Sequence, residues 1–308
     1  MSTVDAPLIV EIAAPQTVES VARRLVRDPT VVFGVAILAL VCIMALVAPL
    51  LTSFDPSSIN PVFRNKTPGA IEVVRAEDGR QEELRHWMGT DSLGRDIASR
   101  VVYGARASLI VGVSVALLAV AMGLAIGLAT GYLRWLDGVV MRIMDGLMAI
   151  PAILLAIAVV SLASAGLSAV IVAIVVPEVP RVVRLVRSVV LSVREEPYVE
   201  AAISVGTPTL PLVLRHILPN TLPPLIVQAT YICAAAMLIE AILSFLGVGI
   251  PPQTPTWGNI MAEGRTLFRI YPHNVFYPGI FLALTVLAVN LLGDGLRDTL
   301  DPRMRKRI

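Results

Sequence analysis

Long apolar runs recur along this chain and leave few folds open to it. In lipid a segment must satisfy its own backbone hydrogen bonds, and the two-residue alternation of a barrel strand is absent here, so each run is expected to be a helix. Helices of this length cross roughly 30 Å of hydrocarbon. The sequence therefore predicts an all-α polytopic membrane protein with about six transmembrane helices, at Val31–Leu51, Ala107–Tyr132, Ile143–Ala163, Leu167–Leu185, Leu218–Leu246 and Val275–Leu292.

The composition agrees with that reading. Only 16% of the 308 residues are charged, against about 25% in a typical soluble domain. The net charge of +2 is spread over several loops, so no basic face for nucleic acid is expected. Cys42 and Cys233 both lie in apolar runs, which favours small core residues over a disulfide or a metal pair. No metal site is predicted.

The distribution of Lys and Arg orients the chain. Basic residues cluster before the first run, around the loop that begins near Glu200, and after the last run, which predicts a cytoplasmic location for that loop and for both termini. The predicted organisation is a cytoplasmic segment at 1–30 with a short amphipathic helix at 21–30, a first span at 31–51, an extracytoplasmic loop at 52–106, a transmembrane core at 107–295 that includes a loop at 198–219, and a cytoplasmic tail at 296–308.

The loop itself reads EAAISVGTPTLPLVLRHILPN from Glu200 to Asn220. It predicts a short helix that ends at Gly206 and a second helix that re-enters the membrane, because glycine readily adopts the left-handed turn that ends a helix. Thr207 or Thr209 is expected to cap the second helix. A hairpin that only faced lipid would not need such a turn, whereas a docking surface for another protein would.

The spacing of Glu-Ala-Ala, Gly206 and Leu-Pro resembles the EAA loop of ABC importer permeases. In that family the short coupling helix of this loop binds in a groove of the ATP-hydrolysing subunit. Arg215-His216 is common in the peptide and nickel branch, whereas Pro208 and Pro211 depart from the usual pattern. The resemblance implies ATPase contacts by Glu200, Ala201, Ala202, Gly206, Leu218 and Pro219.

A second motif ends the long outer loop, HWMGTDSLGRDIASRVVYGARASL, from His86 to Leu109. Its glycine spacing is that of a phosphate-binding loop, but Arg95 and Asp96 replace the Lys and the hydroxyl that such a loop needs, so no nucleotide site is predicted. The run resembles the signature of peptide and nickel importer permeases. Ion pairs that fix the loop over the outer mouth are expected, with direct substrate contact as the alternative; the motif residues are Gly89, Asp91, Gly94, Arg95, Asp96 and Arg106.

Charged residues within the spans are functional candidates because each costs roughly 2.5–3.5 kcal/mol on insertion scales. Glu240 and Glu178 are the candidates for lining a pathway; a structural hydrogen bond is the alternative for Glu240, and a bond to Arg181 for Glu178. Gly123, Gly127 and Gly131 recur at intervals of four and predict a close helix approach, either within this chain or against a partner permease.

The closing run, from Asn290 to Arg303, is typical of the C-type permease of dipeptide, oligopeptide and nickel importers, and the resemblance extends over about Val31–Arg303. It implies the type I ABC importer permease architecture with a cytoplasmic coupling helix. It also implies a bacterial inner membrane location and import of peptides, with nickel or another small solute as the alternative. The implied partners are a second, related permease, two ATPase subunits and an extracytoplasmic binding protein. This chain would then be no enzyme and would bind no cofactor, since ATP and Mg²⁺ belong to the partner subunits.

An ion-coupled secondary transporter or channel is the alternative from another class. It would require ionisable ligands within the membrane, including histidines or paired acids. His86, His216 and His273 all lie in loops or at span ends, which counts against that alternative.

Overall fold

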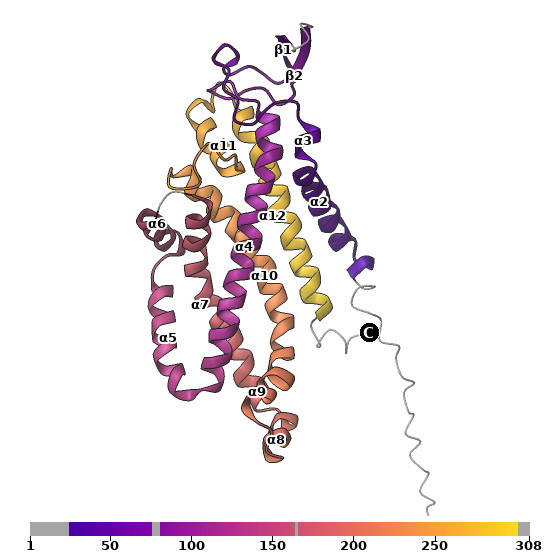
Figure 1. Cartoon of the computed structure of the whole chain (residues 1–308). Coiled ribbons are helices and arrows are strands. Elements are labelled where there is room, and N and C mark those ends of the chain that lie inside the picture. The colour runs from indigo at the N-terminus through magenta and orange to yellow at the C-terminus, as the bar shows by residue number, and fades with distance from the viewer. Residues whose placement is uncertain (1–24, 76–80, 164–165, 301–308) are drawn as a thin grey trace, which may run out of the picture.

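The computed structural model describes residues 25–75, 81–163 and 166–300 and shows a helical bundle that carries a small hairpin at one end (Figure 1). The amphipathic helix predicted at 21–30 falls mostly outside the described residues; residues 25–27 are helical. The membrane helices and their neighbours are α2 (Pro29–Leu46), α3 (Ala48–Leu51), α4 (Ile97–Tyr132), α5 (Arg134–Ala149), α6 (Ala152–Leu162), α7 (Leu167–Arg194), α8 (Pro197–Ser204), α9 (Thr209–Leu212), α10 (Leu218–Phe245), α11 (Trp257–Gly264) and α12 (His273–Leu300).

The outer loop contains a two-stranded antiparallel sheet that the sequence did not predict. Strand β1 (Ala70–Arg75) pairs with β2 (Gln81–His86), with Ala70 opposite His86. The strand QEELRH alternates no apolar face, and five of its six side chains are not buried, so the usual sequence signal of a strand is missing. The hairpin adds to the predicted helical bundle without changing its class.

The core of the bundle lies between α4 and α7. A Cβ atom on Gly123 would lie 2.4 Å from Cβ of Val182, and one on Gly127 would lie 2.6 Å from Cβ of Val186. Gly131 faces Val190 in the same way. The glycine stripe therefore packs within this chain, which decides between the two alternatives for it.

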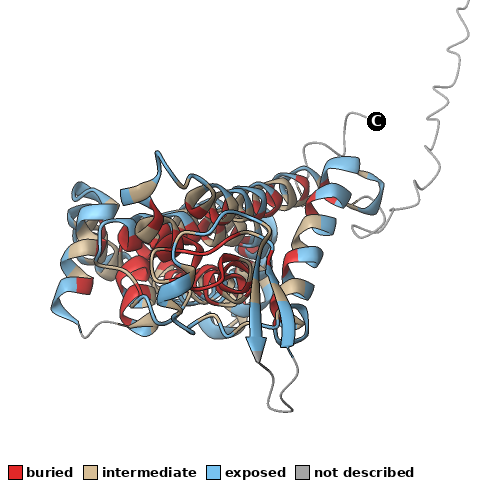
Figure 2. Ribbon diagram, turned by 90° about the horizontal axis from the view of Figure 1, so that it is seen from above, coloured by how far each residue is buried: buried red, intermediate tan, exposed pale blue. Residues whose placement is uncertain are grey.

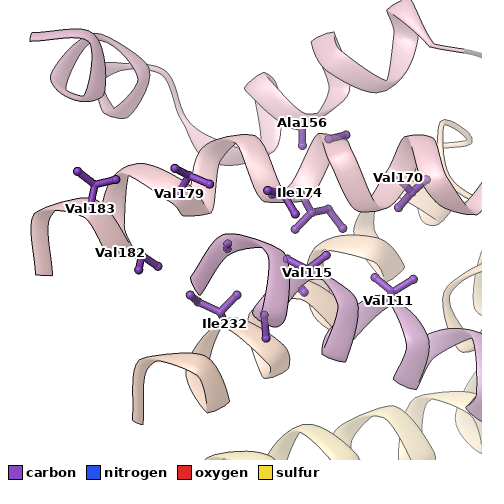
Figure 3. Close-up of a cluster of buried hydrophobic side chains, with 14 of the residues drawn as sticks. Val111, Val115, Ala156, Val170, Ile174, Val179, Val182, Val183 and Ile232 are labelled. Atoms are coloured by element: carbon purple, nitrogen blue, oxygen red, sulfur yellow. The ribbon is translucent and has the colours of Figure 1, made fainter. Parts of the chain in front are cut away.

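Valines fill most of the space beside this contact (Figure 3). Val111 and Val115 of α4 face Val170 and Ile174 of α7, and all four side chains are fully buried. Seen from above, buried residues gather in the middle of the bundle while its rim is largely exposed (Figure 2). A wide exposed apolar rim is expected of a chain whose outer surface meets lipid or other membrane subunits.

The six predicted spans agree only in part with the helices of the structure. Within the described residues, four helical stretches are long and apolar enough to cross a membrane: α2, the run Thr209–Phe245, α4 and α12. The predicted third span is two helices, α5 and α6, bent by 95°, and it makes a fifth span only if the pair is counted as one. The bend lies at Pro151, the N-cap of α6, where the missing N–H favours a break between two helices.

The predicted fourth span is the 28-residue helix α7. It passes through Pro177 and Pro180 without ending. It does not count among the apolar spans because Glu178, Arg181 and Arg184 stand in its middle. Two other boundaries also move: α4 begins at Ile97, ten residues before the predicted start of the second span at Ala107, and α12 runs to Leu300, into the predicted tail.

Candidate coupling segment and outer latch

The predicted coupling segment lies at the end of the bundle opposite the hairpin (Figure 1). Helix α8 ends in a turn at Gly206, whose φ is +79°. The Gly206 N–H donates to the Ile203 carbonyl at 2.9 Å, and the Thr207 N–H donates to the Ala202 carbonyl at 3.1 Å. These two bonds form a Schellman cap, which satisfies carbonyls at the helix end and requires the left-handed conformation at the glycine. The predicted helix–glycine–helix geometry is present.

The predicted threonine cap of the second helix is wrong. Helix α9 has Pro208 at its N-cap, and no side chain caps it. The Thr209 hydroxyl instead accepts a hydrogen bond from the Tyr132 hydroxyl at 3.5 Å, which links the segment to the inner end of α4. A π-helical turn at Val213–Ile217 joins α9 to α10, so the helix that re-enters the bundle starts at Thr209 and not at Leu218.

Helix α8 is anchored on one side and exposed on the other. Val199 is fully buried, the Tyr198 hydroxyl accepts from the Asn220 side-chain amide at 3.1 Å, and the Tyr198 ring lies 6.3 Å from that of His216. The exposed side includes Ile203, which is 48% exposed, and Val205, which is 82% exposed. Of the predicted contact residues, Ala202 and Leu218 are half-buried, whereas the exposed ones are Glu200, Ala201, Gly206 and Pro219.

At the opposite end, four charged residues form a cluster that we call the outer latch: Asp91, Arg95, Arg100 and Glu263. Arg95 Nε donates to Asp91 Oδ2 at 2.7 Å and its Nη2 donates to Glu263. Arg100 Nη2 donates to the same Glu263 oxygen at 3.1 Å. The first three residues are almost fully buried, and Glu263 is 22% exposed at its side chain. The latch joins the segment before α4 to α11, which lies between α10 and α12.

Burial raises the pKa of Glu263 in the latch, and the nearby charges of Arg100 and Arg95 offset only part of that rise. Next to the latch, Trp257 at the start of α11 is fully buried, and its indole N–H donates to the Val101 carbonyl at 3.0 Å. The last outer segment is thus fixed to the top of α4 by both charged and apolar contacts.

Two of the motif residues make contacts other than those predicted. Asp96 does not join the latch but caps α4 by accepting from the Ser99 N–H at 2.6 Å, and it also bonds His86 Nδ1 at 2.8 Å. Arg106 pairs with none of the motif acids that were expected. It donates to the Ala45 and Leu46 carbonyls at the end of α2, where a helix leaves carbonyls without partners.

The glycines of the outer motif have conformational roles. Gly89 has φ +81° and Gly94 has φ +79°. A Cβ atom on Gly94 would lie 1.8 Å from the Asn60 carbonyl oxygen, so the backbone of residues 91–95 can approach the preceding loop only with glycine there. This close approach places Asp91 for its bond to Arg95.

Sequence reasoning did not predict the pairing of Arg100 with Glu263. Arg100 lies within the quoted motif, and Glu263 lies in the last outer segment, 163 residues further along the chain. Neither residue carries a local signal of its partner. Only the folded chain brings the two together.

Both predicted pathway carboxylates are enclosed within this chain. Glu240 is fully buried, and its Oε1 accepts from the Ser244 hydroxyl at 2.9 Å and from the Thr256 hydroxyl at 2.8 Å. Glu178 is 1% exposed and accepts from Arg181 at 2.8 Å. Each makes the structural bond considered as the alternative; a pathway role for either stays a prediction. Across the described part of the chain, no group of three or more His, Cys, Asp or Glu could hold a metal ion.

Comparison with known proteins identifies the family. The family model described as binding-protein-dependent transport system inner membrane component matches residues 92–306, and the N-terminal TM domain of oligopeptide transport permease C matches residues 18–68. The chain belongs to the first of these families. The permease is therefore a multi-pass component of the bacterial inner membrane and not an enzyme, and membership implies ATPase and binding-protein partners.

Individual relatives agree with this assignment. The permease is 52% identical over 289 residues to a probable peptide ABC transporter permease of Sinorhizobium fredii, with 94% of each chain covered. It is 40% identical to a dipeptide transport system permease of Alkalihalophilus pseudofirmus, over 92% of this chain and 89% of that one. A glutathione transport system permease of Escherichia coli is 45% identical over 72% of this chain and 74% of its own length.

The fold has a solved counterpart. A chain of the inward-facing MetNI methionine ABC transporter superposes with a TM-score of 0.55 at 21% identity, over 67% of this chain and 98% of that chain. This likeness confirms the predicted ABC importer permease fold.

Proposed function

We propose that this permease forms half of the translocation pathway of an ATP-driven importer of peptides. An extracytoplasmic binding protein delivers the peptide to the outer segments, and ATPase subunits drive the change between outward-facing and inward-facing arrangements. Support for peptides comes from the relatives, which are named for peptide, dipeptide and glutathione transport. Nickel or another small solute is the alternative cargo.

The observation that carries the proposal is the exposed side of α8. Ile203 of α8, Val205 at its C-cap and Leu210 of the following helix α9 are 48%, 82% and 67% exposed at the end of the bundle opposite the outer latch. Exposed apolar side chains on a short, anchored helix form a surface suited to a partner protein. Because α8 follows α7 directly and contacts α10 through Asn220, a partner that moved α8 would act on both helices.

The proposal assigns the remaining parts of the assembly. A second, related permease completes the pathway, two ATPase subunits bind ATP and Mg²⁺, and this chain binds no cofactor. Both termini and α8 face the cytoplasm, whereas the hairpin and the outer latch face outward. ATP can drive transport only if it favours one arrangement of the permease pair over the other.

The test is uptake by a deletion strain compared with the strain complemented by the intact gene. Labelled di- and oligopeptides are supplied in parallel with radioactive nickel. Loss of peptide uptake alone, restored by complementation, is the expected result. Loss of nickel uptake alone would replace peptides by the metal as cargo. Uptake that persists after ATP depletion but collapses with the ion gradient would instead indicate a secondary transporter.

A further inference from the structure

A groove of about 590 Å³ lies between α7, α10 and α12, and we call it the inner groove. It runs along one side of α10 from Pro219 to Tyr231, and α12 contributes Arg297 to its wall. Pockets of 300–1,000 Å³ are typical of small-molecule sites. Of its lining residues, Pro219 and Asn220 already have a role in the coupling segment, and the others have none assigned so far.

The groove offers an unusual set of polar groups for a membrane helix face. Asn220, Gln228 and Tyr231 line it together with the guanidinium of Arg297. Pro223 and Pro224 lie within α10 and lack the N–H groups that would bond the carbonyls four residues earlier. The carbonyls of Pro219 and Asn220 are therefore left without their helical donors and are available to other donors.

These groups match the chemistry of a short peptide. A guanidinium binds a carboxylate through two parallel hydrogen bonds, and here it stands at one end of the groove. Amide side chains and free carbonyls can bond the amide and ammonium groups of a peptide backbone. The rest of the wall is apolar, with Val227 and Leu300 among its residues, and can accept peptide side chains.

The groove is also connected to the coupling segment. Asn220, which lines the groove, donates its side-chain amide to the Tyr198 hydroxyl of α8 at 3.1 Å and to the His216 carbonyl at 2.7 Å. A movement of α8 would therefore change the position of a groove residue directly. This link places the groove where a change driven by the ATPase could weaken ligand binding.

We propose that the inner groove is a low-affinity peptide site on the cytoplasmic part of the pathway, where Arg297 binds the C-terminal carboxylate of the transported peptide. The proposal rests on the proposed function, and it adds a substrate contact on this chain. The Tyr231 hydroxyl donates its proton to Asp294 at 2.6 Å, so towards a ligand it can only accept a hydrogen bond, and the carboxylate contact falls to Arg297 alone. The freed carbonyls at the other end of the groove would accept from the peptide's donors.

The experiment compares a labelled dipeptide with its C-terminal amide in proteoliposomes that contain the complete transporter and the binding protein. The quantity compared between variants is the ratio of acid uptake to amide uptake. Any preference of the binding protein contributes equally to this ratio in every variant, so it does not affect the comparison. Arg297→Gln should lower uptake of the free acid about tenfold and leave the amide within twofold, because one charge-assisted contact is lost. Arg142→Gln removes an exposed arginine from α5, outside the groove, and should leave the ratio unchanged.

A second measurement does not depend on turnover. A photoactivatable dipeptide is irradiated with the purified assembly without ATP, and labelling within residues 219–231 is expected, reduced by excess unlabelled dipeptide and by Arg297→Gln. The groove assignment would be overturned if Arg297→Gln left the ratio of acid to amide uptake unchanged. It would also be overturned if an anionic lipid, but no peptide, displaced the label. If the intact assembly takes up neither peptide with ATP, the proposed function itself is wrong and this inference fails with it.

Discussion

The contact between Gly127 and Val186 allows a sharp test of how α4 and α7 pack. The perturbation is Gly127→Ala, which adds one methyl group to the buried side of α4. The added Cβ would lie 2.6 Å from Cβ of Val186, 2.8 Å from its Cγ1 and 3.0 Å from the Val183 carbonyl oxygen. Because the Cβ atom of Val186 is attached directly to the backbone of α7, no change of side-chain rotamer removes the clash.

The magnitude follows from two opposing effects. Real Cβ contacts rarely fall below about 3.4 Å, so the helices must separate by roughly 0.8 Å at this point. Insertion of a methylene group into a well-packed core costs about 1–3 kcal/mol. Alanine regains up to about 1 kcal/mol over glycine in a helix interior. We therefore expect Gly127→Ala to lower the free energy of unfolding by up to about 2 kcal/mol.

The assay is reversible unfolding of the purified permease in mixed micelles, followed by far-UV circular dichroism. Gly146→Ala in α5 is the matched control, because it makes the same change within a helix but meets nothing within 4 Å. That control should be neutral or stabilising by up to about 1 kcal/mol. The double variant Gly127→Ala with Val186→Gly removes the clashing Cβ, so it should lose less stability than the two single variants added together.

Equal stabilities for Gly127→Ala and Gly146→Ala would refute the close packing of α4 on α7. So would strictly additive effects in the double variant, since residues in contact are expected to couple.

Three further predictions concern the latch and the coupling segment. Asp91→Ala should destabilise the permease by about 3–5 kcal/mol because Arg95 Nε loses its buried partner and two buried arginines are left with the single carboxylate of Glu263. Glu83→Ala on the exposed hairpin should change stability by less than about 0.5 kcal/mol; unfolding of the two variants measures the difference. Gly206→Val should abolish uptake of labelled peptide by the complemented strain, with the amount of permease in the membrane unchanged, because valine resists the φ of +79° at the Schellman cap. Survival of peptide uptake would contradict the coupling role. Burial raises the pKa of Glu263, so the stability that this residue contributes is present at pH values below its ordinary pKa and falls as the pH rises through the raised value. The slope of the free energy of unfolding against pH should therefore flatten in Glu263→Gln. An unchanged slope would exclude Glu263 as the source of the pH dependence.

The parts of the fold that sequence could predict are those with a local signal. A left-handed helix end has a strong preference for glycine, so the turn at Gly206 was predictable from the residue and its neighbours. The bend between α5 and α6 also had a signal, because a proline removes a backbone hydrogen bond and favours a kink or an end of a helix. The apolar character of the whole run outweighed that proline, so the break within the predicted third span was not predicted.

Other features depend on neighbours that sequence does not reveal. The spacing of Gly123 and Gly127 predicts a surface that a helix can approach closely, but it does not say which helix. The glycine–valine contact required the folded bundle. The same holds for Glu263, whose partners Arg95 and Arg100 lie 168 and 163 residues earlier in the chain. Local pairing of motif residues was the natural expectation, and it was right for Asp91 with Arg95 but wrong for Arg106.

The two ends of the permease are connected through the helices that pack most closely. Asp96 caps α4 and Arg100 fixes its first turns to the outer latch, while the glycines further along α4 are in direct contact with α7. Because close-packed helices cannot slide or separate without a cost, α4 and α7 should move as one body. Helix α7 leads into α8, so a partner bound to α8 would act on the latch through this rigid pair.

Helix α10 differs, since Pro223, Pro224 and the preceding π-helical turn weaken its backbone bonding on the side of the inner groove. We therefore expect α10 to be the element that changes shape when α8 moves, and the inner groove to be the place where that change acts on a ligand.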